Sequence, residues 1–189
     1  KQKRKNNIMS TLKTHKPIVL ALSVGALMTL GILGVGLSLN PHSIPTPSLN
    51  KPGRPLEVSF LEGNLSTQKP LSLKSLEGKP VVLNFWASWC TNCQRESVTL
   101  QKSWDKYKSK DLSMVGIAVH DRQEDALNSA KEWGKTYTLA SDLEGKTAIN
   151  YGVTGVPETF FIDKKGIIRH HHIGPLSDQE MEQYLTEIL

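Results

Sequence analysis

The feature that most constrains the fold is residues 81–93, an apolar run that ends in two cysteines, Cys90 and Cys93. Residues 81–85 are mostly β-branched or aromatic, and Gly78-Lys79-Pro80 precedes them. A run of this kind, bounded by turn residues, predicts a buried strand. Residues 94–110 carry apolar side chains at helical spacing, which predicts a helix. The cysteines therefore stand where a strand passes into a helix.

The start of a helix favours a reactive thiolate, because unpaired backbone N–H groups and the positive end of the helix dipole stabilise negative charge there. The thiolate is the nucleophilic form of cysteine, and this setting lowers the pKa of the thiol. Cys90 comes first, beside the turn, and is predicted to be the nucleophile. Cys93 lies one helical turn further on and is predicted to be the resolving thiol. We interpret the pair as a redox-active disulfide.

Two other uses of the cysteine pair stay open at this point. A structural zinc ion needs about four ligands, and the chain has only 2 cysteines. The run His170, His171 and His172 adds little, since neighbouring residues of a strand face opposite sides and only His170 and His172 share one. A permanent structural disulfide is the second alternative, although so short a loop makes poor use of it. No metal or other cofactor is expected.

The basic charge of the chain belongs to its N-terminal part. Residues 1–39 contain six lysines and arginines and no acidic residue, whereas the remainder has 17 basic and 18 acidic residues. The net charge of +5 is therefore absent from the part that carries the cysteines. A nucleic-acid partner is not expected, because no basic excess remains there to bind phosphates.

Four segments are predicted along the chain. Residues 1–16 form a basic cytoplasmic tail, and residues 17–39 are uncharged and long enough for a transmembrane anchor. The positive-inside rule places the cysteines on the extracytoplasmic side. Residues 40–55 contain five prolines and predict a semi-rigid linker, and residues 56–189 form the folded domain. A cleaved signal peptide is the alternative to the anchor, but no Ala-x-Ala site follows the apolar run.

Periodicity predicts the remaining elements of the domain. A pair of short strands is expected within residues 56–76. The further elements are a strand parallel to the first at 113–119, helices at 121–134 and 146–151, strands at 159–162 and 167–173 joined by a turn at 163–166, and a last helix. Ser177 and Glu180 predict a capping box at the start of that last helix.

Two motifs resemble a known family. Phe85-Trp86-Ala87-Ser88-Trp89-Cys90-x-x-Cys93 resembles the active-site segment of thioredoxin-fold proteins. Residues 155–163, Gly-Val-Pro-Glu-Thr-Phe-Phe-Ile-Asp, are similar to the membrane-anchored reductases of the CcmG/DsbE type and their TlpA/ResA relatives. The resemblance covers about residues 60–189. It implies an α/β thioredoxin fold, a central mixed β-sheet flanked by helices, with an N-terminal β-hairpin extension and one N-terminal transmembrane helix.

The resemblance also implies site residues. Pro157 is expected to follow a cis peptide bond and to lie beside the cysteines, with Val156 and Pro157 binding the substrate backbone. Trp89 is expected to contact substrate, while Trp86 belongs to the core. Glu96, three residues after Cys93 and on the same helical face, is expected to be partly buried and to transfer protons. Glu158 is expected at the surface, in substrate recognition.

The implied function is reduction of the disulfide in the CxxCH haem-binding motif of apocytochrome c, with electrons from a membrane donor of the DsbD/CcdA type. The implied location is the bacterial inner membrane with the catalytic domain in the periplasm, or the thylakoid lumen in a photosynthetic source. Thr91-Asn92 departs from the proline-containing dipeptides frequent in the family. A general extracytoplasmic thiol reductase or oxidase, and a copper-binding chaperone, stay open as alternatives.

Overall fold

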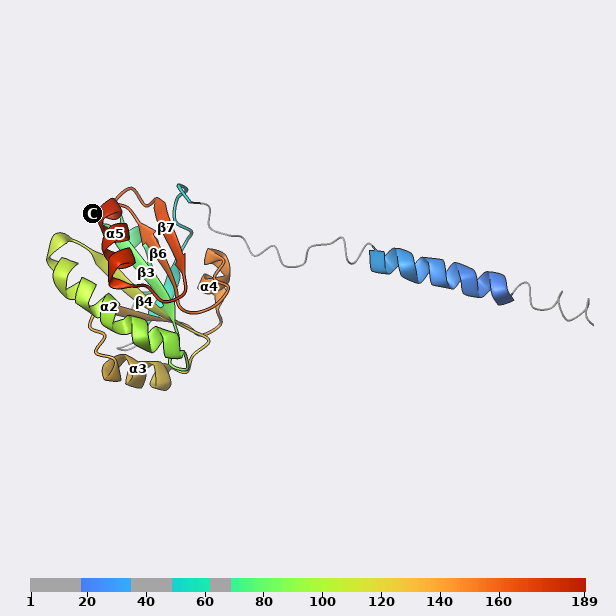
Figure 1. The fold of residues 1–189 in the computed structure, drawn as a ribbon, viewed down its shortest axis with the longest axis horizontal. Helices are drawn as coiled ribbons and strands as arrows, with labels where there is room; N and C mark the ends of the chain where they lie inside the picture. The colour runs from blue at the N-terminus through green and yellow to red at the C-terminus, as the bar shows by residue number, and fades with distance from the viewer. Residues whose placement is uncertain (1–17, 35–48, 62–68) are drawn as a thin grey trace, which may run out of the picture. The chain divides into compact units, whose positions relative to one another are not determined.

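The computed structural model describes residues 18–34, 49–61 and 69–189, and it divides into two units, Lys1–Ser43 and Ile44–Leu189 (Figure 1). Residues 18–34 of the first unit are helical, and their side chains are exposed. Within these described ranges, no helix combines the length and apolar character needed to cross a membrane. The predicted tail, both ends of the predicted anchor over 17–39 and most of the linker over 40–55 lie outside the described residues. The transmembrane helix thus stays a prediction.

The second unit is an α/β domain of strands and helices. Its strands are β1 (Glu57–Phe60), β2 (Leu71–Ser72), β3 (Val81–Trp86), β4 (Ser113–Val119), β5 (Thr138–Asp142), β6 (Glu158–Ile162) and β7 (Ile168–Ile173). Its helices are α2 (Thr91–Tyr107), α3 (Gln123–Glu132), α4 (Lys146–Tyr151) and α5 (Asp178–Ile188), with short 3-10 segments at Leu73–Leu76 and Lys108–Lys110.

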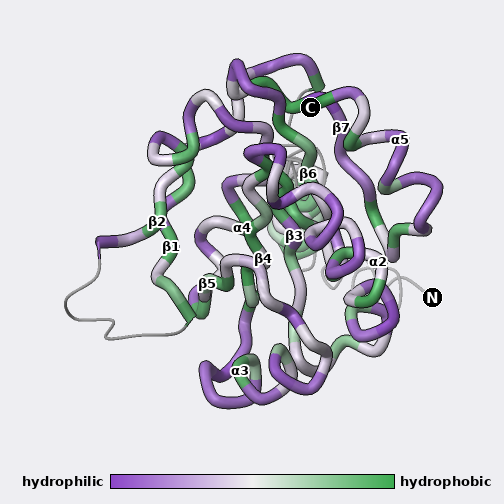
Figure 2. The backbone as a smooth tube through the Cα atoms, turned by 90° about the vertical axis from the view of Figure 1, so that its left-hand side faces the viewer, coloured by the Kyte–Doolittle hydropathy of each residue, from purple (hydrophilic) through white to green (hydrophobic). Residues whose placement is uncertain are grey.

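The strands form one mixed sheet in the order β2-β1-β5-β4-β3-β6-β7 (Figure 2). β3, β4 and β5 are parallel, while β6 and β7 continue the sheet antiparallel on one side and β1 and β2 on the other. The mixed sheet, the parallel pairing of β3 with β4 and the N-terminal strand pair are confirmed. β5 was not predicted, because its five residues include one large apolar side chain, Leu139, and its burial comes from strands on both sides.

β3 is the central buried strand, with every residue inaccessible to solvent. On one face Phe85 packs against Tyr151 of α4, with ring centroids 5.7 Å apart. On the other face Val82 packs in a cluster with Leu100 of α2 and Leu185 of α5. The helices therefore cover both faces of the sheet (Figure 1), and the carboxyl end of β3 delivers the chain directly to the cysteines.

The side chains around Gly116 leave little space for a larger residue. A Cβ atom on Gly116 would lie 3.0 Å from the Tyr137 ring and 3.1 Å from both Trp86 Nε1 and Leu139 Cδ2. We expect Gly116→Ala to lower the free energy of unfolding by about 1–3 kcal/mol, because overpacking displaces buried rings. Urea denaturation measures the change. Gly155→Ala is the control, since nothing lies within 4 Å of its Cβ position; equal stability of the two variants would contradict the prediction.

Candidate active site

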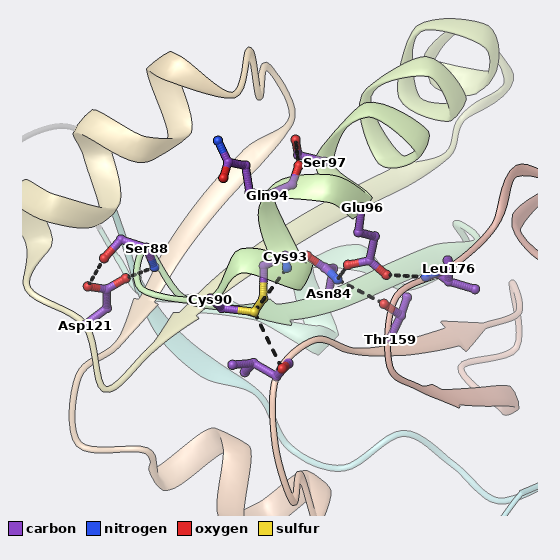
Figure 3. The surroundings of a disulfide bond; sticks show 11 residues. Asn84, Ser88, Cys90, Cys93, Gln94, Glu96, Ser97, Asp121, Thr159 and Leu176 are labelled. Atoms are coloured by element: carbon purple, nitrogen blue, oxygen red, sulfur yellow. Dashed lines mark hydrogen bonds between the residues drawn. A yellow bond between two sulfur atoms is a disulfide. The ribbon is translucent and has the colours of Figure 1, made fainter.

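Cys90 and Cys93 are joined by a disulfide at the junction of β3 and α2 (Figure 3). Cys90 is the N-cap of α2, and its Sγ accepts a hydrogen bond from the backbone N–H of Cys93 at 3.1 Å. The helix thus begins at Thr91, three residues earlier than its apolar pattern suggests. Cys90 is 7% exposed and Cys93 is 1% exposed. An incoming thiolate therefore reaches Cys90 more readily, in keeping with its predicted role as nucleophile.

Asp121 holds the segment before the cysteines in place. Its carboxylate accepts hydrogen bonds from the backbone N–H of Ser88 at 2.5 Å and from the Ser88 hydroxyl at 2.7 Å. Asp121 follows β4, which lies beside β3, so this bond ties the active-site loop to the neighbouring strand. Sequence reasoning missed this contact, because Asp121 was read only as the start of a helix, and residues 33 positions apart give no local signal.

The loop that precedes β6 lies against Cys90. The carbonyl oxygen of Val156 is 3.5 Å from Cys90 Sγ, and the Val156–Pro157 peptide bond is cis, as the resemblance implied. Trp89 is 65% exposed beside the disulfide. A hollow of about 270 Å³, lined mainly by apolar side chains that include Trp89, Ile149 and Val156, opens there. Trp89 and Val156 therefore lie beside Cys90, with Pro157 next in the chain, and the binding of substrate by these three residues stays a prediction.

The expectation that Glu158 lies at the surface is wrong. Its side chain is fully buried beneath the same loop. One carboxylate oxygen accepts hydrogen bonds from the Thr154 N–H, the Thr154 hydroxyl and the Gly155 N–H at 2.7–3.0 Å, and the other lies 2.8 Å from His171 Nε2. Burial by itself would raise the pKa of Glu158, but these bonds outweigh it and lower the pKa. Glu158 therefore holds the shape of the loop that faces Cys90.

The first two of the three consecutive histidines contact different carboxylates. His170 Nε2 lies 2.6 Å from a Glu187 carboxylate oxygen, and the His171 ring stacks on Phe160 while it contacts Glu158. Across the part of the chain that the structure describes, no group of three or more His, Cys, Asp or Glu side chains is placed to hold a metal ion.

Glu96 is 2% exposed, on the face of α2 that carries Cys93. Its two carboxylate oxygens accept one hydrogen bond each, from Asn84 Nδ2 at 2.9 Å and from the Leu176 N–H at 3.0 Å (Figure 3). Asn84 also donates to the Thr159 hydroxyl at 3.0 Å. The carboxyl group thus joins β3 and the segment before α5 to the active-site helix, and Asn84 extends this network to β6.

The protonation of Glu96 is shifted by its surroundings. Burial raises the pKa of Glu96 from 4.5 to about 7, and the bonds from Leu176 and Asn84 and the charge of Lys135 only partly counter this rise. A carboxyl group with a pKa near neutrality can both accept and donate a proton during a reaction. Glu96 is thus more deeply buried than the resemblance implied. Its role in proton transfer stays a prediction.

Glu96 makes stability fall with rising pH. Its pKa is higher in the folded chain than the ordinary value of 4.5, so the unfolded chain releases the proton first. Its contribution is therefore present below pH 4.5 and lost by about pH 7. Between pH 4 and pH 8, we expect the free energy of unfolding of Glu96→Gln to rise by about 3 kcal/mol relative to that of the wild type.

Urea denaturation of both disulfide-intact proteins at the two pH values measures this gain. Glu132→Gln removes an exposed carboxylate from α3 and controls for the lost charge. A difference between Glu96→Gln and the wild type that does not change with pH would contradict the prediction.

Comparison with known proteins shows which family the chain resembles. The model of the AhpC/TSA family matches residues 57–171. The thiol:disulfide interchange protein DsbE of Xylella fastidiosa strain 9a5c is 35% identical over 176 residues, which are 92% of this chain and 86% of that protein. The thiol-disulfide oxidoreductase ResA of Bacillus thuringiensis is 33% identical over 131 residues, 69% of this chain and 73% of that protein.

Solved structures agree. A thiol:disulfide interchange protein of the thioredoxin family from Chlorobium tepidum is 27% identical with a TM-score of 0.62, covering 75% of this chain and 97% of that one. The extent of these matches and the cysteine pair lead to one conclusion. The chain belongs to the AhpC/TSA family and, within it, to the thiol-disulfide oxidoreductases of the DsbE and ResA type.

Proposed function

We propose that this oxidoreductase works as a reductase on the disulfide of CxxCH haem-binding motifs in apocytochrome c, outside the cytoplasm. The observation that carries the proposal is the disulfide itself, whose accessible sulfur lies between Trp89 and the Val156–Pro157 loop. The similarity to DsbE proteins over nearly the whole chain supports it. In an oxidising compartment a net reductant must be resupplied with electrons, and a membrane donor of the DsbD/CcdA type is the proposed source.

The reaction proceeds by two exchanges. The Cys90 thiolate attacks one sulfur of the substrate disulfide, and the other substrate sulfur leaves as a thiolate. Cys93 then loses its proton and attacks Cys90, which breaks the mixed disulfide and releases the second substrate thiolate. The two released thiolates take up protons, and the two electrons they gain come from the Cys90 and Cys93 thiols.

We propose one assisting group or feature for each step. The Cys93 N–H, which hydrogen-bonds Cys90 Sγ, and the helix N-terminus stabilise negative charge on Cys90. Cys93 is buried, so its proton needs an acceptor inside the protein. Glu96 is the proposed acceptor, because it shares the helical face of Cys93 and its pKa is about 7.

The surface around Cys90 suits an extended peptide with an apolar side chain near its cysteines. Trp89 and the hollow beside it present apolar surface, and the Val156 carbonyl lies at the rim. Because Glu158 fixes the loop from below, the rim is formed before the substrate arrives. Preorganisation of this kind lowers the entropic cost of binding.

Cys93→Ser tests the order of the two thiols. We expect this variant to accumulate a mixed disulfide through Cys90 with an oxidised CxxCH peptide, because the resolving thiol is absent. Mass spectrometry of the quenched reaction detects the adduct. The reduced wild-type chain is expected to release both peptide thiols under the same conditions.

Cys90→Ser is the matched control and is expected to form little adduct, since Cys93 is buried. Adduct formation through Cys93 instead would contradict the assigned roles. Transfer of a disulfide from the oxidised chain to a reduced CxxCH peptide, with no reduction in the other direction, would identify a general oxidase rather than the proposed reductase.

We also propose that residues 17–39 attach the chain to the membrane with the cysteine domain on the outer side. The support is the uncharged sequence that follows a basic segment, and the exposed apolar side chains of residues 18–34. We expect the full chain to stay with membranes on carbonate extraction, and Leu27→Arg to weaken this, because arginine in an apolar span costs about 3 kcal/mol. Recovery of the wild-type chain in the supernatant would rule out the anchor.

A further inference from the structure

Lys135 is a buried lysine that the reaction described above does not use. It lies between α3 and β5 and is 7% exposed. In the described part of the chain its Nζ has no hydrogen-bond partner. An ammonium group taken out of water without partners costs several kcal/mol, so a lysine at such a depth calls for a compensating interaction.

Aromatic rings supply part of this compensation. Lys135 Nζ lies 3.8 Å from the centroid of the Trp86 ring, 5.5 Å from that of Trp133 and 5.7 Å from that of Tyr137. The electron-rich faces of such rings attract a cation, and the attraction grows when water is excluded. Burial still lowers the pKa of Lys135 to about 7, against the opposing effect of Glu96. We call the rings of Trp86, Trp133 and Tyr137 the aromatic box. The lysine in this box has a pKa near 7, so neighbouring charges affect whether it is protonated.

The box is attached to the active site through Trp86. This residue ends β3, and its side chain packs in the same apolar cluster as Cys90 and Cys93. The Trp86 and Trp133 rings meet at 5.5 Å, which joins α3 to the same cluster. Lys135 thus lies on a ring that also packs in the cluster of the two cysteines.

A second contact holds the Lys135 segment against the active-site helix. Gln101 of α2 accepts a hydrogen bond from the Thr136 N–H at 2.9 Å and donates one to the Thr136 hydroxyl at 2.7 Å. The pair of bonds fixes the residue next to Lys135 to the helix that carries Cys93 and Glu96. These bonds therefore hold the segment that carries Lys135 against α2.

The groups that act on Glu96 can be named. From β3 comes Asn84, and from the segment before α5 comes the Leu176 N–H. Lys135 is the cation whose charge stabilises the Glu96 carboxylate. Tyr137 is also titratable, but burial and the charge of Glu96 raise its pKa far above neutrality, so it stays neutral.

We propose that Lys135 is a positioning residue of the thiol–disulfide reaction, whose ammonium group favours the carboxylate form of Glu96, the form that accepts the proton of Cys93. The proposal rests on the role of Glu96 given above. The proton passes from Cys93 Sγ to the Glu96 carboxylate, and the resulting thiolate attacks Cys90 Sγ. The bond between Cys90 and the substrate sulfur breaks, and the substrate thiolate takes a proton from solvent.

Lys135→Met tests the proposal, because methionine fills a similar volume without the charge. The full chain is labelled with glutamate carrying ¹³C at the side-chain carboxyl, and the Glu96 signal is assigned by its absence in Glu96→Gln. In the oxidised protein we expect the titration midpoint of Glu96 to move upward by about one pH unit in Lys135→Met. Lys131→Met, an exposed lysine of α3, is the control and should leave the midpoint unchanged.

The resolving step gives a second readout. In single turnovers of the reduced chain with an oxidised CxxCH peptide, we expect Lys135→Met to resolve the mixed disulfide about five- to tenfold more slowly at pH 7. The wild-type rate should return as the pH rises by about one unit. A purely structural lysine would lower the rate equally at all pH values, and that result would overturn the proposal.

The reciprocal measurement needs no change at Lys135. Coupling between two sites is mutual, so Glu96→Gln should lower the titration midpoint of the Lys135 ammonium group, followed by ¹⁵N at Nζ. Unmoved midpoints in both variants would overturn the proposal. If Glu96→Gln resolves the mixed disulfide as fast as the wild type while the midpoints move as expected, the charge coupling stands and the catalytic role proposed for Glu96 fails, and with it the role of Lys135 in the reaction.

Discussion

β3 is buried on both faces, and the position of the disulfide follows from that burial. Helices α2 and α5 cover one side of the strand and α4 the other, and the chain leaves the sheet at the carboxyl end of β3, where the cysteines follow. α2 begins five residues after the strand ends, with Cys90 as its cap. The same apolar packing that orders the domain therefore places a sulfur at a helix N-terminus, where negative charge is favoured. Asp121 and the Val156 loop then hold the junction from the sides.

The core near the disulfide contains buried polar and charged side chains. Asn84, Glu96 and Lys135 are all buried, and each comes from a different segment of the chain. Burying such groups opposes folding unless they are paired, and Glu96 and Lys135 both have pKa values moved toward 7 by that burial. Perturbed ionisable groups of this kind gather at functional sites, because a proton acceptor works best near the ambient pH. In the proposed mechanism, the stability lost by this burial accompanies proton transfer from Cys93.

Local patterns predicted the parts of this structure that local physics determines. The apolar run of β3, the Cys-x-x-Cys spacing and the Ser177–Glu180 capping box each lie within a short segment, and the structure contains all three. β5 was missed because its burial comes from neighbours on both sides and not from its own alternation. Glu158 was placed at the surface because its partner His171 lies on the next strand. Lys135 gave no signal at all, since the rings that surround it include Trp86, 49 positions earlier in the chain.

Glu96 and Glu158 show why burial alone does not define a proton acceptor. Both side chains are almost completely inaccessible, yet the pKa of Glu96 is raised and that of Glu158 is lowered. Glu158 is held by three donated hydrogen bonds and by His171, which together outweigh desolvation, whereas Glu96 receives only two bonds. A carboxylate held so firmly keeps its charge and supports a loop. One with fewer donors stays close to protonation, and a nearby cation such as Lys135 then lowers its pKa further.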